Sequence, residues 1–391
     1  MSLRVGLLCH RGVGGSARIA VDLGNALAAR GHTVHLFART LPLGIANFGR
    51  GVTFHPLRDG DGHAPATALL DEDWSAPDLD TLVERVGGVV RSSGLDVLHF
   101  HYAIPFAWVA AEAVRRLGGR APRLVGTLHG TDVSVHGRSP KGPSVARDLA
   151  QADRLTTVSR SHVRLATVAF SLPTPPDLIP NFVDVGRFRP TNGRGVESTR
   201  PRRIVHVSNF RPVKDPASVV RVFARVRRDL DAELWLVGDG EAMPAVRSAV
   251  RRARVGPHVR FFSLHPAVER VLPHADLLLL TSRAESFCLA ALEAAACGVP
   301  AVAPRIGGLP EVVAHGETGL LFRPTDEAEA ARAVLSLLDD RDAHARMKGE
   351  AARRARRFST EIMVPRYEWV YRALLDGRTQ ALPPTTGGAG P

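Results

Sequence analysis

Residues 277–303 read LLLLTSRAESFCLAALEAAACGVPAVA, and they predict a strand, a helix and a second strand in that order. The apolar run Leu277 to Leu280 has the length of a buried strand, and the alanine-rich segment after it predicts a helix that starts near Ser286. A further apolar run begins at Ala301. Strands that alternate with helices form parallel sheets covered by those helices. The stretch therefore predicts an α/β fold.

The same alternation runs through both halves of the chain. In the first half we predict strands at 4–9, 33–37, 97–100, 124–127 and 154–158 and a helix at 17–29. In the second half we predict strands at 204–207, 233–237, 259–262, 277–280, 301–303 and 319–322. The pattern predicts two Rossmann-like, doubly wound domains, residues 1–188 and 204–359, facing a central cleft, with the polar and basic segment 189–203 as linker.

Three further segments are predicted from composition. Residues 43–77 are rich in Gly, Pro, Asp and Ala and predict a long loop. Residues 356–375 predict a closing helix with the aromatic anchors Tyr367, Trp369 and Tyr371, and we expect its part from 360 to 376 to pack back on the first domain. Residues 377–391 are rich in Pro, Gly and Thr and predict a disordered tail.

Bulk composition limits the classes of function. The 391 residues contain no apolar run of membrane-spanning length, and the start of the chain reads as a strand rather than a signal peptide. Three cysteines without ligand spacing indicate a reducing, cytoplasmic setting. The net charge of +12 comes from Arg scattered over helices, so we expect a solvated basic face and no nucleic-acid partner. A basic nucleotide-binding or membrane-surface module is the non-enzymatic alternative.

The segment between Glu285 and Glu293 carries the strongest chemical signal. The N–H groups of Phe287, Cys288 and Leu289 would lie at the start of the predicted helix, where unpaired N–H groups attract a diphosphate. Glu285 precedes the helix, and Glu293 lies about two turns further on, where its carboxylate can accept hydrogen bonds from ribose hydroxyls. The alternative is that both are ordinary surface charges of a helix.

A second signal follows the first strand of the second half, in SNFRPVK, residues 208–214. Arg211 and Lys214 carry the positive charge that a departing diphosphate requires, although a basic surface turn would look the same. The glycine turn that starts at Gly238 follows the neighbouring strand and belongs to the same edge of the sheet.

In the first half, two segments follow strands. Residues 12–16 read GVGGS before the first helix, a glycine turn that lets the backbone approach a ligand or simply permits tight packing. Residues 127–132 read TLHGTD, in which His129 can contact a transferred sugar and Thr131 an acceptor, although a lone histidine is more often structural.

Metal-dependent chemistry is not expected. The pairs Asp59 and Asp61, Asp71 and Asp73, and Asp78 and Asp80 resemble a metal-binding Asp-x-Asp, but they lie in or beside the predicted loop. A zinc site formed by His99, His101, His129 and Asp132 is the alternative, but no spacing in the sequence requires it. We also find no nucleophile and base pair of the triad type.

These blocks together resemble retaining glycosyltransferase family 4, which has the GT-B fold. The resemblance rests on ESFCLAALEAAACGVPAV and GGLPEVVAHGETGLLF, and on VGGSARIAVDLGNALAARGH, HFHYAIPFA, TLHGTDVS, IPNFVD, HVSNFRPVK and LVGDGE. The blocks run from about residue 5 to 370, and within the family they are most similar to the branch that makes N-acetylglucosaminyl malate for bacillithiol.

The resemblance implies roles for particular residues. The donor would be bound by Gly14, Gly15, Asn209, Arg211, Lys214, Gly238, Glu285, Ser286, Phe287, Cys288, Leu289 and Glu293. The acceptor would be bound by Ser16, Arg18, Tyr102 and Thr131, and the chemistry would involve His129, Arg211, Lys214 and Glu285. Cys288 stands where the family usually has Gly, and Arg18 where the malate enzymes tend to have smaller residues, so the sugar and acceptor stay open.

The implied reaction is front-face substitution with retention, in which the leaving diphosphate takes the acceptor's proton. It needs neither metal nor cofactor. The resemblance favours a UDP-GlcNAc-like donor and a malate-like acceptor. The alternative keeps the enzyme and changes its substrates, to a GDP-sugar or other donor and a thiol or hydroxyl acceptor of a natural-product or thiol pathway. A homodimer is left open.

Overall fold

The computed structural model describes residues 1–10, 14–38, 49–57, 76–118, 121–191, 200–263, 267–378 and 380–383. It divides into two compact units. The first unit comprises Met1–Asn181 and Thr360–Pro391, and the second comprises Phe182–Ser359. The first unit therefore ends seven residues before the predicted boundary at 188, and the last helix groups with it.

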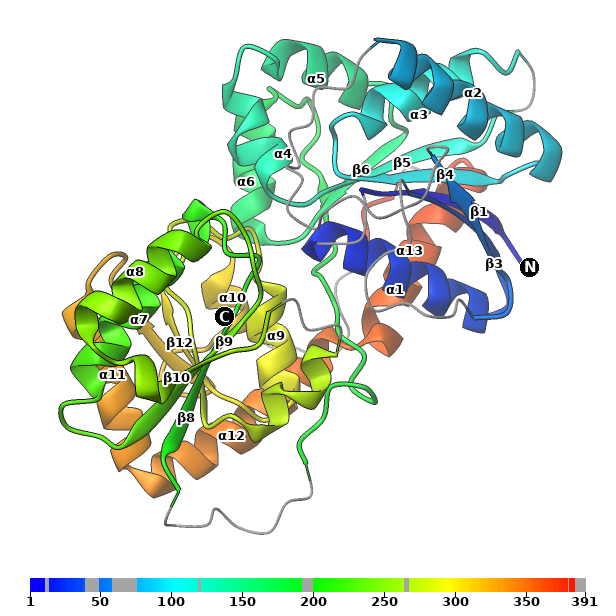
Figure 1. The fold of residues 1–391 in the computed structure, drawn as a ribbon. Coiled ribbons are helices and arrows are strands. Elements are labelled where there is room, and N and C mark those ends of the chain that lie inside the picture. The colour runs from blue at the N-terminus through cyan, green and yellow to red at the C-terminus, as the bar shows by residue number, and fades with distance from the viewer. Residues whose placement is uncertain are drawn as a thin grey trace. The chain divides into compact units, whose positions relative to one another are not determined.

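The first unit contains a parallel sheet with the strand order β3-β2-β1-β4-β5-β6-β7. The strands are β1 (Arg4–Leu8), β2 (Thr33–Ala38), β3 (Val52–Pro56), β4 (Val97–His101), β5 (Arg123–Leu128), β6 (Arg154–Thr157) and β7 (Asp177–Leu178). The helices are α1 (Gly15–Ala29), α2 (Ala76–Ser93), α3 (Phe106–Arg115), α4 (Thr131–Ser134), α5 (Gly142–Leu149), α6 (Arg160–Ala169) and α13 (Thr360–Leu375). Figure 1 shows α1 and α13 on one face of this sheet and α2 and α3 on the other.

The second unit repeats the arrangement, with the order β10-β9-β8-β11-β12-β13. Its strands are β8 (Arg202–Val207), β9 (Ala232–Val237), β10 (Val259–Phe261), β11 (Leu277–Leu279), β12 (Ala301–Pro304) and β13 (Gly319–Phe322). Its helices are α7 (Pro216–Val226), α8 (Met243–Ala253), α9 (Leu289–Ala296), α10 (Leu309–Val312), α11 (Glu327–Asp339) and α12 (Arg341–Ala355). Both sheets are covered by helices, so their central strands are buried on both faces and mostly apolar. The predicted α/β fold with two doubly wound units is confirmed.

Each sheet reverses its direction of growth at one place. In the first unit this switch point lies between β1 and β4, and in the second between β8 and β11. Loops that leave the carboxyl ends of such neighbouring strands diverge to opposite faces and leave room for a ligand. The two switch points therefore mark where a site is expected in each unit.

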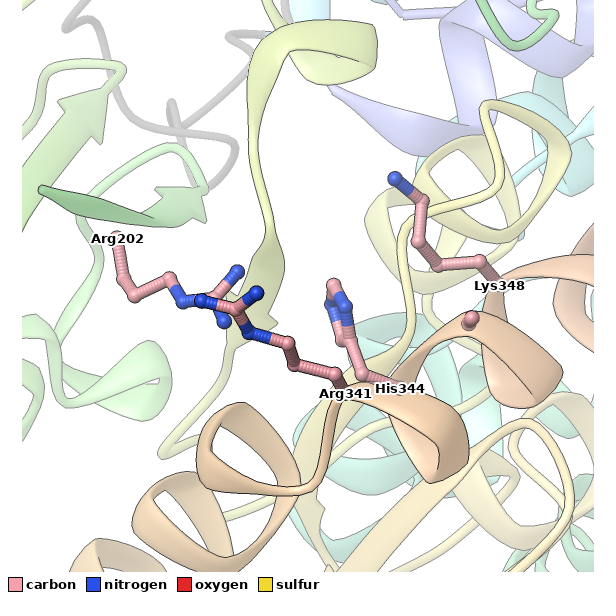
Figure 2. Close-up of a pocket in the computed structure, with 5 residues that line it drawn as sticks. Arg202, Arg341, His344 and Lys348 are labelled. Carbon is pink, nitrogen blue, oxygen red and sulfur yellow. The ribbon is translucent and has the colours of Figure 1, made fainter. Parts of the chain in front are cut away.

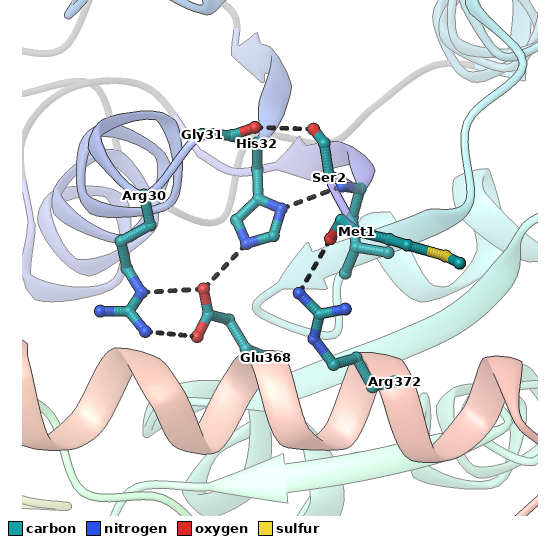
Figure 3. A network of polar contacts seen from close by, with 8 residues as sticks. Met1, Ser2, Arg30, Gly31, His32, Glu368 and Arg372 are labelled. Atoms are coloured by element: carbon teal, nitrogen blue, oxygen red, sulfur yellow. Dashed lines mark hydrogen bonds and ion pairs between the residues drawn. The ribbon is translucent and has the colours of Figure 1, made fainter.

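Helix α13 is fixed to the first unit by a polar network (Figure 3). Glu368 accepts hydrogen bonds from the guanidinium of Arg30, with both Nε–Oε1 and Nη2–Oε2 at 2.8 Å, and its Oε1 lies 2.8 Å from His32 Nε2. Burial would raise the pKa of Glu368, but these hydrogen bonds hold it below its ordinary value. Arg372 donates to the backbone oxygen of Met1 at 2.9 Å. The C-terminal helix α13 is therefore held against the N-terminal residues of the same unit.

Several boundaries differ from the predictions. Strand β3 lies inside the segment predicted as a loop, 43–77, because its residues Val52–Pro56 pair with β2 as an edge strand that is only partly buried and has a weak apolar pattern. The two-residue strand β7 is too short to show a pattern. The closing helix starts at Thr360, since 356–358 form a separate 3-10 turn. Most of the predicted tail 377–391 lies outside the described residues.

The Asp-x-Asp pairs also need one correction. Asp59, Asp61, Asp71 and Asp73 lie outside the described residues. Asp78 and Asp80 lie in the first turns of α2 rather than in a loop, and Asp80 accepts a hydrogen bond from Arg116 at 2.8 Å. Asp80 is thus part of a surface ion pair between α2 and α3.

Candidate active site

In the second unit, four loops meet in two pairs at the carboxyl edge of the sheet through close backbone contacts. Gly238 has φ of +128°, and a Cβ atom there would lie 1.8 Å from the backbone oxygen of Ser208. Gly307 has φ of +49°, and its Cβ would lie 1.8 Å from the backbone oxygen of Glu285. Only glycine fits these two places, because any side chain would overlap the neighbouring loop. The loops after β8, β9, β11 and β12 are therefore packed into one surface.

Lys214 and Glu285 form an ion pair across the switch point of this unit. The Lys214 Nζ atom lies 2.7 and 2.8 Å from the two carboxylate oxygens, and Ser282 Oγ donates to Glu285 Oε1 at 2.7 Å. The Glu285 side chain is only 5% exposed. Burial would lower the pKa of Lys214, but the adjacent carboxylate outweighs this and raises it above its ordinary value. Lys214 is therefore a cation at neutral pH.

Backbone and side-chain contacts hold the two loops of this pair in register. The backbone N–H of Arg283 donates to the oxygen of Val213 at 2.8 Å, and the Thr281 hydroxyl donates to the oxygen of Asp215 at 2.8 Å. Arg283 also pairs with the Asp215 carboxylate at 2.9 Å. Lys214 and Glu285, 71 residues apart, are thus brought together by the fold.

The helix after Glu285 begins later than predicted. Helix α9 starts at Leu289, with Cys288 as its N-cap residue at φ +84° and ψ +84°. The N–H groups of Phe287 and Cys288 therefore precede the helix instead of forming its first turn. Cys288 is buried in a left-handed conformation that favours glycine, the residue that the family resemblance implies at this position. The sequence does not predict this later start of the helix, because helix propensity carries no information about φ at the N-cap residue.

The side chains around this turn point in different ways. Phe287 is fully buried and belongs to the core, and its ring contacts Phe358 edge to face. Burial raises the pKa of the Cys288 thiol, and the neighbouring Glu285 carboxylate raises it further, so this thiol is protonated. Ser286, Leu289 and Glu293 are half-buried. Of the predicted donor residues in this segment, Phe287 can offer only its backbone.

Asn209 and Arg211 lie in the loop between β8 and α7. Arg211 is half-buried and immediately precedes the 3-10 turn that contains Lys214. The Asn209 Oδ1 atom is buried and has no hydrogen-bond partner among the described residues. A buried acceptor without a donor is costly in the free protein, which indicates that a ligand or solvent hydroxyl satisfies it.

In the first unit, the corresponding edge carries neutral polar side chains. His101 Nδ1 lies 3.0 Å from His129 Nε2, and the ring of His101 also contacts that of His99, with centroids 4.3 Å apart. His99 bonds to Tyr371 of α13 and to Thr127, each at 2.7 Å. Burial lowers the pKa of His99 to about 3, and it also brings the pKa of His101 and His129 well below the ordinary value. These imidazoles are neutral at pH 7.

Tyr102 and Thr131 also come together, with their hydroxyl oxygens 2.7 Å apart. Tyr102 has φ of +83°, an uncommon conformation for a non-glycine residue that is often found at functional sites. The Asp132 carboxylate holds the turn between them by accepting hydrogen bonds from the backbone N–H groups of His129, Gly130 and Ala103. Asp132 is therefore a structural residue of this loop.

At the start of α1, only part of the glycine turn is described. Gly12 and Val13 lie outside the described residues. Gly14 has φ of +148° and nothing within 4 Å of a Cβ, so its backbone conformation rather than packing requires glycine. Gly15 is exposed and Ser16 half-buried at the first helical turn. Arg18 donates to Asp22 within the same helix at 2.8 Å, which partly neutralises its charge.

Some site residues were missed by sequence reasoning. Ser282 positions Glu285, and Gly307 with Gly308 supports the loop before α9. His206 bonds to the oxygen of Leu279 and to Ser208, both at 2.9 Å, and burial lowers its pKa to about 4. The glycine pair in GGLPEV, residues 307–312, could have indicated this loop, but in the sequence it supported only the family resemblance.

The described part of the chain contains neither a candidate membrane span nor a candidate metal site. No helix in it is both long and apolar enough to span a membrane, and no group of three or more His, Cys, Asp or Glu side chains is arranged to hold a metal ion. Both ring nitrogens of His99 bond to Tyr371 and Thr127, and His101 Nδ1 bonds to His129 Nε2. His101 Nε2 is buried and has no hydrogen-bond partner among the described residues.

Comparison with known proteins supports the same division into two parts. Residues 13–187 match the model "Glycosyltransferase Family 4", and residues 191–354 match "Glycosyl transferases group 1". The chain is 34% identical to the N-acetyl-alpha-D-glucosaminyl L-malate synthase of Bacillus anthracis, over 96% of this chain and 98% of that protein. It is 30% identical to the D-inositol 3-phosphate glycosyltransferase of Corynebacterium efficiens, over 92% and 91%.

Solved structures show the fold. Sucrose-phosphate synthase from Thermosynechococcus elongatus has a TM-score of 0.80 at 21% identity, covering 96% of this chain and all of that one. Anabaena HepE, solved with UDP and glucose, has a TM-score of 0.75 at 17% identity and covers 95% of this chain and all of its own. With this fold and full-length similarity, the chain belongs to the family 4 glycosyltransferases, enzymes of the GT-B fold.

Proposed function

We propose that this glycosyltransferase transfers N-acetylglucosamine from UDP to malate or a similarly small polar acceptor, with retention of configuration and without a metal ion. The observation that carries the proposal is the Lys214–Glu285 pair at the switch point of the second unit. The similarity to a malate-modifying relative over 96% of the chain supports the choice of substrates.

The donor-binding role follows from the hydrogen-bonding capacity of the pair. A lysine ammonium has three N–H groups, and two of those on Lys214 are directed at Glu285, which leaves one for a phosphate oxygen. Arg211 adds a second cation beside it. Positive charge fixed in place before the reaction stabilises the charge that develops on a leaving diphosphate. Glu293 on α9 is assigned to the ribose hydroxyls, and Asn209 Oδ1 can accept a hydrogen bond from a donor hydroxyl.

The geometry of Glu285 favours front-face substitution over a double displacement. Both of its oxygens accept hydrogen bonds from Lys214, and one also accepts from Ser282. A carboxylate engaged in this way is a weak nucleophile, whereas a double displacement requires one that attacks the anomeric carbon. We therefore assign Glu285 to the sugar hydroxyls and to holding Lys214, and the acceptor's proton to the departing diphosphate oxygen.

The first unit is assigned to the sugar and the acceptor. His129 is neutral at pH 7, so its imidazole can orient a sugar hydroxyl without contributing charge. The Tyr102 and Thr131 hydroxyls offer a hydrogen-bonding pair for a small polar acceptor. Arg18 is a candidate to bind a carboxylate of the acceptor, which would compete with Asp22 for the Arg18 guanidinium.

The proposal is tested by product analysis. Purified protein is incubated with UDP-GlcNAc or GDP-mannose, each with L-malate, inositol 3-phosphate or a low-molecular-weight thiol, in EDTA, and products are identified by mass spectrometry and anomeric NMR coupling. We expect an α-glycoside of malate and release of UDP. A product with inverted configuration, a metal requirement or preference for another donor and acceptor would reject the corresponding part, and no nucleotide release with any pair would favour a binding module.

A further inference from the structure

A cavity lies in the second unit, at the opposite end of the sheet from the candidate active site. Its volume is about 310 Å³, and it is lined by Arg202, Arg341, His344, Ala345 and Lys348. Arg202 is the first residue of β8, whereas Lys214 follows the end of that strand. A six-residue strand spans roughly 17 Å, so the cavity and the Lys214–Glu285 pair are separate.

Helix α12 presents one face to this cavity. Arg341, His344, Ala345 and Lys348 are spaced three and four residues apart and therefore lie on the same side of the helix. Arg202 faces them from β8. Figure 2 shows the Arg202 and Arg341 guanidinium groups directed at one another, with Lys348 extending along the same opening.

The lining of the cavity is rich in cations and carries no carboxylate among the described residues. Within that part of the chain Arg341 and Lys348 form no ion pair, whereas Arg202 and His344 interact electrostatically with Asp276, whose carboxylate is already bonded to Arg200. By contrast, Arg353 on the same helix is paired with Glu350. Like charges gathered in a concave surface raise the local potential and attract an anion.

Two of the lining side chains are held in place by backbone oxygens. Arg202 donates to the oxygen of Leu338 at 3.2 Å, and the buried ring of His344 donates from Nε2 to the oxygen of Asp276 at 2.7 Å. Burial lowers the pKa of His344, and the positive charge of Lys348 lowers it further, so the cationic groups at neutral pH are Arg202, Arg341 and Lys348. The site is thus partly preorganised around three positive charges.

We propose that this cavity binds a small polyanion, a phosphorylated or polycarboxylate metabolite, at a site distinct from the donor and acceptor sites. Arginine forks and a lysine ammonium form charge-assisted hydrogen bonds with phosphate and carboxylate oxygens. The volume suits a small molecule, at the lower end of the range for ligand pockets. Anion binding here is independent of the reaction assigned above.

The test is isothermal titration calorimetry of the full chain with inorganic phosphate and, separately, citrate. The double variant R341Q/K348Q removes two charges from the cavity, and R346Q/R353Q removes two from the same helix outside it. We expect saturable binding to wild type and to R346Q/R353Q, weakened at least about tenfold in R341Q/K348Q. Stronger binding of phosphate or of citrate tells which of the two chemistries the cavity selects.

Three results would overturn the proposal. These are equal affinity in all proteins, no saturable binding of either probe, and loss of binding in K214A with retention in R341Q/K348Q, which would place the anion at the donor site. Circular dichroism confirms that the variants are folded. Because the assay needs no sugar transfer, its failure is distinguishable from failure of the proposed reaction.

Discussion

The two sheets have the same strand order around their switch points, yet their carboxyl edges carry opposite kinds of polar group. The first unit presents the imidazoles of His101 and His129, which are neutral at pH 7, and the hydroxyl of Tyr102. The second presents the Lys214–Glu285 ion pair. The comparison teaches that one topology supports two chemistries: a neutral edge suits sugar and acceptor hydroxyls, and a charged edge suits a diphosphate.

The amino edges, by contrast, are alike. In the first unit Asp96, just before β4, accepts a hydrogen bond from the backbone N–H of Arg4 on β1 at 2.8 Å. In the second, Asp276, just before β11, accepts one from Arg203 on β8 at 2.8 Å. The equivalent strands are thus joined in the same way, which places the functional difference in the carboxyl-end loops.

The largest effect is expected from removing the cation of the charged edge. K214A should lower kcat by about 10²- to 10³-fold, because the leaving diphosphate loses a fixed positive partner. R225A, which removes an exposed arginine in the last turn of α7, is the matched control and should retain most activity. Steady-state UDP release measures both, and a K214A enzyme with near-normal kcat would break the assignment of charge chemistry to this edge.

A second test displaces the loop that carries Glu285 without changing its charge. G307A should lower activity by at least about tenfold, since an alanine Cβ would overlap the Glu285 backbone oxygen and cannot adopt φ of +49° easily. Gly316 also has positive φ, +81°, but nothing lies within 4 Å of a Cβ there. G316A therefore reports strain alone. Equal activities of the two variants would show that the loop contact is unimportant.

Acidification should destabilise the first unit, in which buried histidines such as His99 are neutral. The folded-state pKa of His99 is about 3, below the unfolded value of about 6.5, so the unfolded chain binds more protons as pH falls below 6.5. Stability is complete above pH 6.5 and is lost as pH decreases toward the folded-state pKa. Between pH 6.5 and 5, His99 alone accounts for about 2 kcal/mol.

Urea unfolding at pH 7, 6 and 5, followed by tryptophan fluorescence and circular dichroism, checks this expectation. Carboxylates such as Glu368 titrate at lower pH and do not contribute in this window. H274Q, which removes an exposed histidine of the second unit, is the control and should keep the slope. A free energy of unfolding that is constant from pH 7 to 5 would contradict the neutral, buried state of these histidines.

The smallest effect is expected at Cys288. C288G should stabilise the protein by about 1 kcal/mol, because glycine adopts φ of +84° without the steric cost that a side chain incurs. It should also enlarge the space beside Glu285 and change the ratio of kcat/KM values between donors. C297A, at a buried cysteine with ordinary φ, should not stabilise. Thermal unfolding measures the effect on stability, and donor competition measures the effect on specificity. A C288G protein that is less stable than wild type would contradict the inference that Cys288 is strained.

The sequence by itself determined the fold class and most strands, because alternating apolar runs and amphipathic helices report burial directly. Its patterns also selected the loops after the strands, including those of Lys214 and Glu285. It missed β3, whose edge position leaves it half-exposed, and it placed the start of α9 too early, because a left-handed residue such as Cys288 has no composition signal.

Only the tertiary structure decided which of these side chains meet. Lys214 bonds to Glu285 across 71 residues, and Asp132 serves the backbone of its own loop rather than a ligand. The cavity of Arg202 and Arg341 joins residues 139 positions apart (341 minus 202), and scattered arginines in the sequence did not indicate it. The reason is physical: periodicity encodes which face of an element is buried, whereas distances between loops depend on how whole sheets pack.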